Sequence, residues 1–282
     1  GWLNHKTYLK KADIILIGCL VIFSLSGKSI EYPPNWNKDP KTGIQAPLIY
    51  GKSINYRNSD LVGDIKYLWE PNRHLHLVAL AQAYYLTGDS QYLDGLKLQL
   101  SSWFEQCPYL MGPNWTSSLE LGIRLINWSI IWQLIGEYDS PLFIGEAGSR
   151  LRDQWLKSIY QHCHFINGYW SQYSSANNHL IGEAAGLFIA SVTWPYWKCA
   201  RYWRKLAYNI LLEEALKQNY KDGVNREQAI SYQQFVLDFL LMAGLAARAE
   251  GRDFPQKYWE RIEKMLEFIA AVMDVNGNVP MI

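Results

Sequence analysis

The chain has 282 residues, of which 49% are hydrophobic and only 19% charged, and this composition excludes an intrinsically disordered or charge-dominated protein. Its formal net charge of +1 argues against a nucleic-acid-binding protein that works by neutralising phosphates. Aromatic residues make up 15% of the chain. They suit a carbohydrate-binding surface, because rings cover apolar sugar faces and polar tips bind hydroxyls, but they also fill ordinary cores.

The first 64 residues precede the helical pattern, and we expect them to form short strands and a helix that pack on the domain that follows. The apolar run from Ile14 to Phe23 is too short to span a bilayer. No small-residue cleavage site follows it, so no signal peptide is visible in this chain. The β-branched residues of this run predict a strand.

Cysteine and histidine spacing does not predict a metal site. Cys19, Cys107, Cys163 and Cys199 are far apart, with no CxxC or Cys/His ligand cluster. They are either buried thiols or members of up to two disulfides. His179 and Glu183 share a helical face, but no third or fourth ligand accompanies them.

Residues 65–282 show a helical pattern that repeats about every 50 residues, a period typical of stacked helix pairs. First helices are predicted at residues 72–86, 117–134, 177–192 and 225–249, and second helices at 93–104, 147–165, 197–218 and 258–273. The first helices are apolar nearly all round and the second carry charged faces, which predicts an inner and an outer ring. The fold class is therefore an all-α, incomplete α/α toroid of antiparallel helical hairpins. The starts of its inner helices then converge on one cavity.

Asn177-Asn178-His179 begins the third inner helix. One Asn accounts for an ordinary helix N-cap. The second Asn and the His remain, next to a helix terminus that favours anions, so they are candidates for a functional role.

The fourth inner helix begins near Asn225-Arg226-Glu227-Gln228, with Tyr232 expected on the same face as Asn225. A capping box explains one acidic or amide residue here, but not Arg226 and Tyr232 as well. Tyr232 is either a catalytic base or a core ring with a satisfied hydroxyl.

In the second inner helix, Glu120, Arg124 and Asn127 form one polar stripe. Because buried charges need partners, we expect Glu120 and Arg124 to pair, which is a structural role. A catalytic acid at Glu120 is the alternative.

Several strings together resemble the N-terminal helical domain of heparinase II/III-like polysaccharide lyases, which share their architecture with alginate lyases. They occur in family order over nearly the whole chain: Val62-Gly63-Asp64-Ile65-Lys66-Tyr67, Trp69-Glu70-Pro71-Asn72-Arg73-His74, Asn114-Trp115 with Ser118-Leu119-Glu120 and Arg124, Asn177-Asn178-His179-Leu180 with Glu183, Asp222-Gly223 with Glu227-Gln228 and Tyr232, and Asn276-Gly277-Asn278-Val279-Pro280.

The resemblance implies metal-independent, cofactor-free β-elimination on a uronic-acid polysaccharide by a periplasmic or secreted enzyme. It also implies a C-terminal β-sandwich domain as a partner, which this chain does not include, so the chain looks like part of a longer enzyme. Such a reaction needs a neutralised C5 carboxylate, a base and an acid. By motif position, Asn178 is expected to neutralise the carboxylate, Tyr232 to act as base or acid, and His179 to act as a base or orient its neighbours.

The remaining site residues are candidates for substrate binding. Arg forks match carboxylate and sulfate, which makes Arg73, Arg124 and Arg226 candidates for anion contacts. Trp115 and Trp128 are candidate sugar platforms, and Asn72, Glu120, Asn177 and Glu227 complete the set. Two other functions stay open: a glycoside hydrolase that uses two of Glu70, Glu120 and Glu227, and a non-catalytic glycan-binding module.

Overall fold

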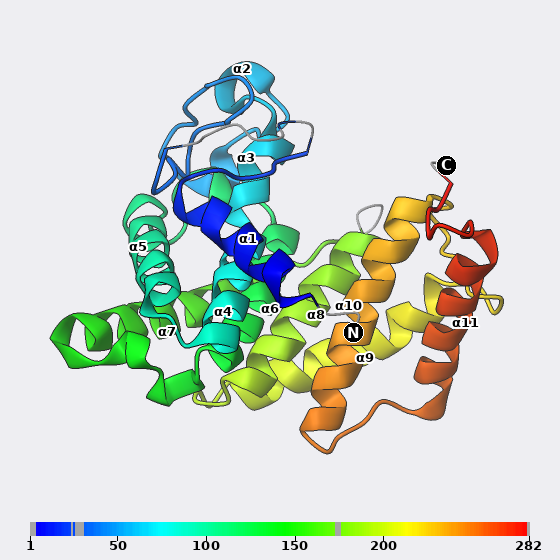
Figure 1. The fold of residues 1–282 in the computed structure, drawn as a ribbon. Coiled ribbons are helices and arrows are strands. Elements are labelled where there is room, and N and C mark those ends of the chain that lie inside the picture. The colour runs from blue at the N-terminus through cyan, green and yellow to red at the C-terminus, as the bar shows by residue number, and fades with distance from the viewer. Residues whose placement is uncertain (1–3, 24, 26–30, 173–175, 281–282) are drawn as a thin grey trace. The chain divides into compact units, whose positions relative to one another are not determined.

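A computed structural model describes residues 4–23, 25, 31–172 and 176–280 (Figure 1). Within these residues, regular structure is helical and β-pairing is confined to isolated bridges, such as Lys38 with Gln45. The all-α prediction is therefore confirmed. The chain divides into two compact units, Gly1–His162 and Cys163–Ile282. The predicted division after residue 64 remains a prediction.

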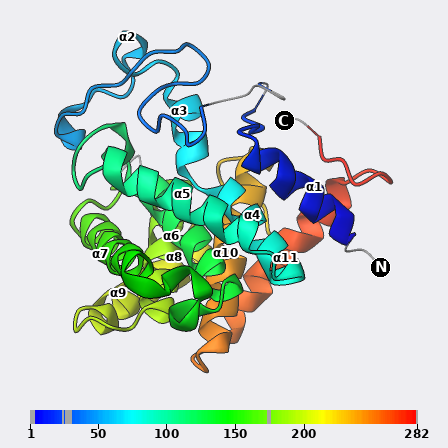
Figure 2. The same cartoon turned by 60° about the vertical axis from the view of Figure 1, so that its left-hand side comes forward.

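The first unit is built around helix α4, which packs against α1, α5 and α6; Figures 1 and 2 both show α1 beside α4. Its α-helices are α1 (His5–Leu16), α2 (Ser59–Val62), α3 (Ile65–Asn72), α4 (Leu75–Thr87), α5 (Ser90–Gln106) and α6 (Ser118–Leu134), and α7 (Gly145–Gly168) continues into the second unit. Short 3-10 helices lie at Gly51–Ser53, Pro113–Trp115, Glu137–Asp139 and Pro141–Phe143.

The strand predicted from Ile14 to Phe23 is wrong. Ile14 lies in the last turn of α1, a helix that begins after an Asn4 side chain that accepts from the Lys6 N–H at 3.1 Å. Beyond the helix, the described residues of this run form isolated bridges and no strand, and one of these bridges joins Ile22 to Leu25. Burial of one helical face against the unit outweighs the weak strand preference of β-branched residues.

The second unit consists of α8 (Asn178–Thr193), α9 (Ala200–Lys217), α10 (Ile230–Ala249) and α11 (Gln256–Val272). Helix α8 packs against α9 and α10, and α11 packs against α9 and α10. As expected for an inner helix, α8 is buried along most of its length. By contrast, α11 buries only the stripe Tyr258, Ile262, Met265 and Ile269. The predicted hairpins at 177–218 and 225–273 are thus present.

Two predicted helix starts are displaced. Asn72 ends the short helix α3, and α4 begins only at Leu75, after His74 in a left-handed conformation with φ 62°. Helix α10 begins at Ile230, so Asn225 to Gln228 lie in the preceding loop rather than on a helical face. Gln228 has φ 56°, which a continuing right-handed helix does not allow.

All four cysteines are free thiols, which settles the alternative between thiols and disulfides. Burial raises the pKa of Cys107 to about 12, so this thiol stays protonated. Helix α10 is long and apolar enough to cross a membrane by length and composition only. Its contacts with α8 and α11 explain that apolar surface in a core helix.

Candidate functional site

The side-chain carboxylate of Glu227 contacts the N-terminus of α8. Glu227 accepts hydrogen bonds from the backbone N–H of Asn178 at 3.0 Å and from its side-chain amide at 2.8 and 2.9 Å. Asn178 is buried, and Asn177 is the N-cap, whose side chain accepts from the His179 N–H at 3.2 Å. Helix N-terminal N–H groups that have no intrahelical acceptor and the helix dipole both favour a negative charge here. We call Asn177, Asn178 and Glu227 the α8 cap site.

A buried polar network holds the loop that carries Glu227. The Asn225 side chain accepts from the Glu227 N–H at 3.0 Å and donates to Asn219 at 3.0 Å. Gln233 of α10 accepts from the Asn225 N–H at 2.6 Å and donates to the Gly223 carbonyl at 2.8 Å. Sequence reasoning missed Gln233. The feature that could have identified Gln233 is a side-chain amide at a buried position of an otherwise apolar helix.

Tyr232 lies in the first turn of α10 with 44% of its surface exposed. This exposure decides against the core-ring alternative for Tyr232. Arg226 is also exposed, and its guanidinium lies over the Tyr220 ring at 4.9 Å from the centroid. The loop before α10 contacts the start of α8 through Glu227, so Tyr232 and Asn178 belong to the same end of the second unit.

The Glu183 carboxylate forms a structural contact with Ser171. It accepts from the backbone N–H of Ser171 at 2.8 Å and from its hydroxyl at 2.6 Å. His179, one turn earlier in α8, is half-buried. Within the ranges that the structure describes, no group of three or more His, Cys, Asp and Glu residues is arranged to hold a metal ion.

In the first unit, Arg73 is bound on both sides by carboxylates. It donates to Glu120 at 2.8 and 2.9 Å and to Glu70 at 2.9 Å. Burial and the nearby Glu120 raise the pKa of Glu70, against the opposing effect of Arg73. The expected Glu120–Arg124 pair is therefore wrong, because the guanidinium that reaches Glu120 is that of Arg73, the residue just after α3. These contacts engage Glu70 and Glu120, two of the three candidate carboxylates from which the hydrolase alternative needs a pair.

Arg124 and Asn72 are core residues, which contradicts their predicted contact with substrate. Arg124 is 0% exposed and donates to the Asn72 and Asn114 carbonyls and to His162 Nε2. Burial lowers its pKa to about 10. The Asn72 side chain is 1% exposed; it donates to the Trp36 carbonyl and accepts from Trp103. Both side chains therefore form their hydrogen bonds inside the core of the first unit.

The predicted sugar platforms are also buried. Trp115 is 1% exposed and Trp128 is 0% exposed, and both rings pack on His162 with centroids 4.6 and 4.7 Å away. A ring must present an open face to stack on a sugar, so these two residues are corrected to packing residues. Sequence periodicity does not distinguish an aromatic at a cavity mouth from one in the core beneath it.

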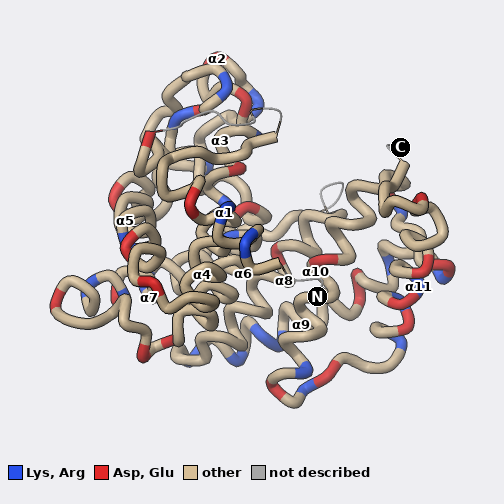
Figure 3. Tube along the Cα trace, viewed as in Figure 1, with Lys and Arg blue, Asp and Glu red and all other residues tan. Residues whose placement is uncertain are grey.

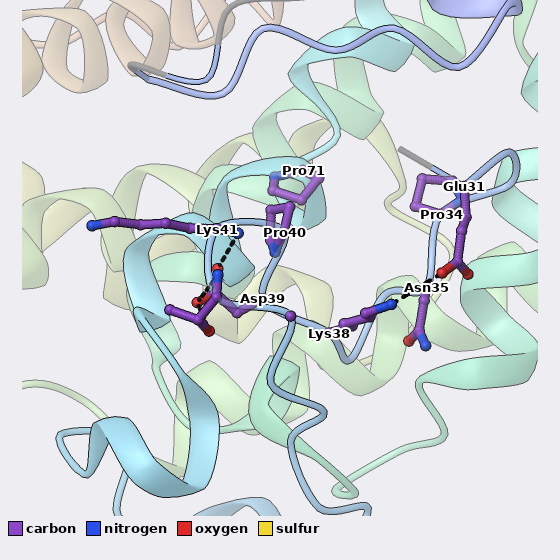
Figure 4. A pocket seen from close by; sticks show the side chains of 10 residues that line it. Glu31, Pro34, Asn35, Lys38, Asp39, Pro40, Lys41 and Pro71 are labelled. Carbon is purple, nitrogen blue, oxygen red and sulfur yellow. Dashed lines mark hydrogen bonds and ion pairs between the residues drawn. The ribbon is translucent and has the colours of Figure 1, made fainter. Parts of the chain in front are cut away.

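The N-terminal loops of the first unit enclose a separate cavity of about 320 Å³ (Figure 4). Its charged groups are already paired: Lys38 with Glu31 at 3.2 Å, and Asp39 with the Lys41 N–H at 2.8 Å. Pro71 closes one wall. No predicted site residue lines this cavity.

Together, the α8 cap site and Tyr232 provide amide donors that hold a carboxylate and an accessible phenol at one end of one helical unit. Such a set can neutralise a carboxylate and move a proton nearby.

Comparisons with known proteins show the family to which the chain belongs. The profile of the family described as Heparinase II/III N-terminus matches residues 35–282. The heparin-sulfate lyase of Pedobacter heparinus is 27% identical over 244 residues, covering 82% of this chain and 35% of that protein. The heparin-sulfate lyase of Bacteroides stercoris is 28% identical over 252 residues, covering 82% of this chain and 36% of the relative.

Solved structures share the fold. The heparan sulfate lyase of Pedobacter heparinus has a TM-score of 0.68 and 22% identity, and the match covers 98% of this chain and 40% of that one. A heparinase III structure gives a TM-score of 0.68 at 21% identity over 97% of this chain and 40% of the other. The predicted fold class, an all-α incomplete toroid of helical hairpins, is confirmed.

The chain belongs to the heparinase II/III family and corresponds to its N-terminal region. It spans little more than a third of the length of the curated relatives that it matches.

Proposed function

We propose that the protein is a polysaccharide lyase that cleaves an anionic, uronic-acid-containing polysaccharide by β-elimination. The observation that carries this proposal is the carboxylate of Glu227 bound by the Asn178 amide and the α8 N-terminus. A site that holds a protein carboxylate in this way has the donors needed for the C5 carboxylate of a uronate. Family membership and the named activities of the relatives give independent support.

In the proposed reaction, Asn178 binds the C5 carboxylate and withdraws its charge, which makes the C5 proton more acidic. Tyr232, an exposed residue, removes that proton or protonates the departing glycosidic oxygen. The C4–O bond breaks as the C4–C5 double bond forms. His179 orients these groups or shares the transfer of the proton, and Arg226 contacts a further anionic group of the polymer.

We propose that no metal takes part, because amide donors and a helix terminus supply the positive potential that elimination needs. Activity should survive prolonged treatment with a chelator. A loss of activity that added metal restores would refute this part of the mechanism.

The decisive experiment measures the ultraviolet absorbance of unsaturated uronyl ends released from heparan sulfate, hyaluronan, alginate and a bacterial exopolysaccharide. Tyr232→Phe should lower kcat by at least about 100-fold, because a general acid–base group contributes about that much or more. Tyr202→Phe, an exposed tyrosine of α9, is the matched control. Full elimination activity in Tyr232→Phe would disprove the mechanism.

Other results would redirect the assignment. Products without an unsaturated end would indicate a hydrolase, and binding without any turnover would indicate a glycan-binding module. Because the relatives are much longer, we also propose that a C-terminal β-sandwich domain completes the cleft and that the enzyme acts in the periplasm or outside the cell. Assaying the 282-residue chain beside the full-length protein that contains it, with cell fractionation, tests both points.

A further inference from the structure

A basic cavity lies at the opposite end of the second unit from Tyr232. It measures about 310 Å³ and is lined by Phe188 of α8, by Arg201, Arg204, Lys205 and Tyr208 of α9, and by Glu250, Arg252 and Asp253 after α10. Figure 3 shows blue segments at the start of α9 and mixed charges in the turn between α10 and α11. Helix α10 has 20 residues, so about 30 Å separates this cavity from the end that carries Tyr232.

The two carboxylates of the cavity are already engaged. Glu250 forms an ion pair with Arg204. Asp253 pairs with Arg248 at 2.8 Å and accepts from the Trp259 indole at 2.7 Å and from the Phe254 N–H at 2.8 Å. Neither carboxylate is therefore available to neutralise the other cations.

Three cations of the cavity have no such partner. In the part of the chain that the structure describes, Arg201, Lys205 and Arg252 take part in no ion pair. Burial, and to a smaller extent the like charges of Arg252 and Arg201, lowers the pKa of Arg204. The first turns of α9 add the positive end of the helix dipole. An anion placed here would relieve this repulsion.

One wall of the cavity is aromatic. Tyr208 stacks on Phe254 with ring centroids 4.2 Å apart, and the Tyr208 ring lies 6.2 Å from Phe188. A volume of about 310 Å³ is at the small end of known ligand pockets and exceeds what a bare ion needs. Cations beside an aromatic wall suit a sugar ring that carries a tetrahedral oxyanion, because Arg forks bind the oxyanion and the ring packs on the aromatic face.

We propose that this cavity is a second binding site, for a sulfated sugar unit, remote from the α8 cap site. Oxyanion binding here is independent of the proposed lyase activity; only the identification of the sugar as part of the substrate polymer rests on that activity. In that case, the site would hold a distant part of the same sulfated chain while elimination takes place at Tyr232.

Calorimetric titration of the 282-residue chain tests the proposal, with Asn178→Ala as the background so that the α8 cap site does not contribute. The probes are inorganic sulfate, a sulfated heparin-type disaccharide, its unsulfated counterpart and a sugar phosphate. The sulfated disaccharide should bind at least tenfold more tightly than the unsulfated one, and more weakly as salt rises. The double variant Arg201→Gln/Lys205→Gln should lose at least tenfold in affinity, whereas Lys257→Gln, an exposed lysine outside the cavity, should not.

Equal affinity for the sulfated and unsulfated disaccharides, or unchanged affinity in the double variant, would overturn the proposal. Tighter binding of the sugar phosphate would also overturn it and assign the cavity to a phosphorylated ligand. Because the readout is binding, loss of elimination in Tyr232→Phe with retained binding would separate this site from the lyase site. A thermal unfolding curve of the double variant confirms that it is folded.

Discussion

Asn178 and Glu227 are 49 positions apart, yet they form the most direct chemical contact of the candidate site. The Glu227 carboxylate takes both side-chain contacts of the Asn178 amide and one backbone N–H. Hydrogen bonds to an ionised group are about twice as strong as neutral ones, so this contact holds the amide in one orientation. It also means that a substrate carboxylate must compete with Glu227 for the same donors.

Glu227→Gln should therefore favour substrate binding. The neutral amide binds Asn178 more weakly, so KM for the uronate polymer should fall several-fold with little change in kcat. Initial rates over a range of polymer concentrations measure both constants, and Glu213→Gln, an exposed residue of α9, is the control. A higher KM would instead assign Glu227 the role of positioning Asn178 for the substrate.

Arg73 is not available to bind a substrate anion, because its charge pairs with Glu70 and Glu120 within the protein. Arg73→Gln should cost about 3 kcal/mol of unfolding free energy, the lower end for a broken buried pair, since it leaves Glu120 without its charge partner. Chemical denaturation measures this change. Arg150→Gln, which breaks the exposed pair with Glu146, should cost less than about 1 kcal/mol. Equal costs would contradict the structural role of Arg73.

At the scale of elements, the segment between α9 and α10 decides the geometry of the site. Gln233 anchors the polar network of this segment on α10. Gly223 allows the backbone of the segment to approach α11 closely. A Cβ at Gly223 would lie 2.1 Å from the Lys264 carbonyl oxygen, and the residue has φ 92°. This position therefore requires glycine for both backbone conformation and space.

Gly223→Ala should displace the loop that holds Glu227. A left-handed alanine costs about 1–2 kcal/mol by itself, and the clash with α11 adds to that cost. Gly251→Ala is a matched control, because Gly251 has φ 76° with nothing within 4 Å of the added Cβ. Thermal unfolding should show a larger loss for Gly223→Ala, and elimination activity should fall only in that variant. Equal losses of stability would contradict the close contact with α11.

At the scale of the whole molecule, the buried aromatic cluster and the candidate site lie in different parts of the chain. The first unit holds a buried cluster of tryptophans and histidines that carries no exposed chemistry, with Trp103, Trp128 and His162 at its centre. The second unit holds the α8 cap site and Tyr232. The curated relatives are nearly three times as long as the region of each that matches this chain.

Buried histidines should make the protein sensitive to mild acid. Burial lowers the pKa of His74 and His162 well below 6.5, so both stay neutral in the folded protein. As the pH falls below about 6.5, the unfolded chain takes up protons that the folded chain does not, and the free energy of unfolding decreases. Stability is therefore highest above this pH and declines towards the lower folded pKa.

Denaturant unfolding between about pH 8 and about pH 5.5 measures this dependence. His162→Gln should show a shallower slope, because glutamine still accepts from Arg124 but does not titrate. His5→Gln, an exposed residue of α1, should keep the slope of the unmodified protein. An unchanged slope in His162→Gln would show that other groups control the acid response.

Helical hairpins and their inner and outer faces were predictable from the sequence, because burial imposes a 3.6-residue pattern that is local and readable. The motif around Asn178, Glu227 and Tyr232 was also recognisable from its residues. Three features were not: burial of Trp115 and Arg124, the pairing of Glu120 with Arg73, and the capture of Asn178 by Glu227. Each of these depends on which residues, distant in sequence, meet in space. An aromatic or charged residue has the same local pattern at a cavity mouth and in the core below it. The sequence by itself thus determined the helices and the chemical groups available, and only the tertiary structure decided which of those groups are free to act.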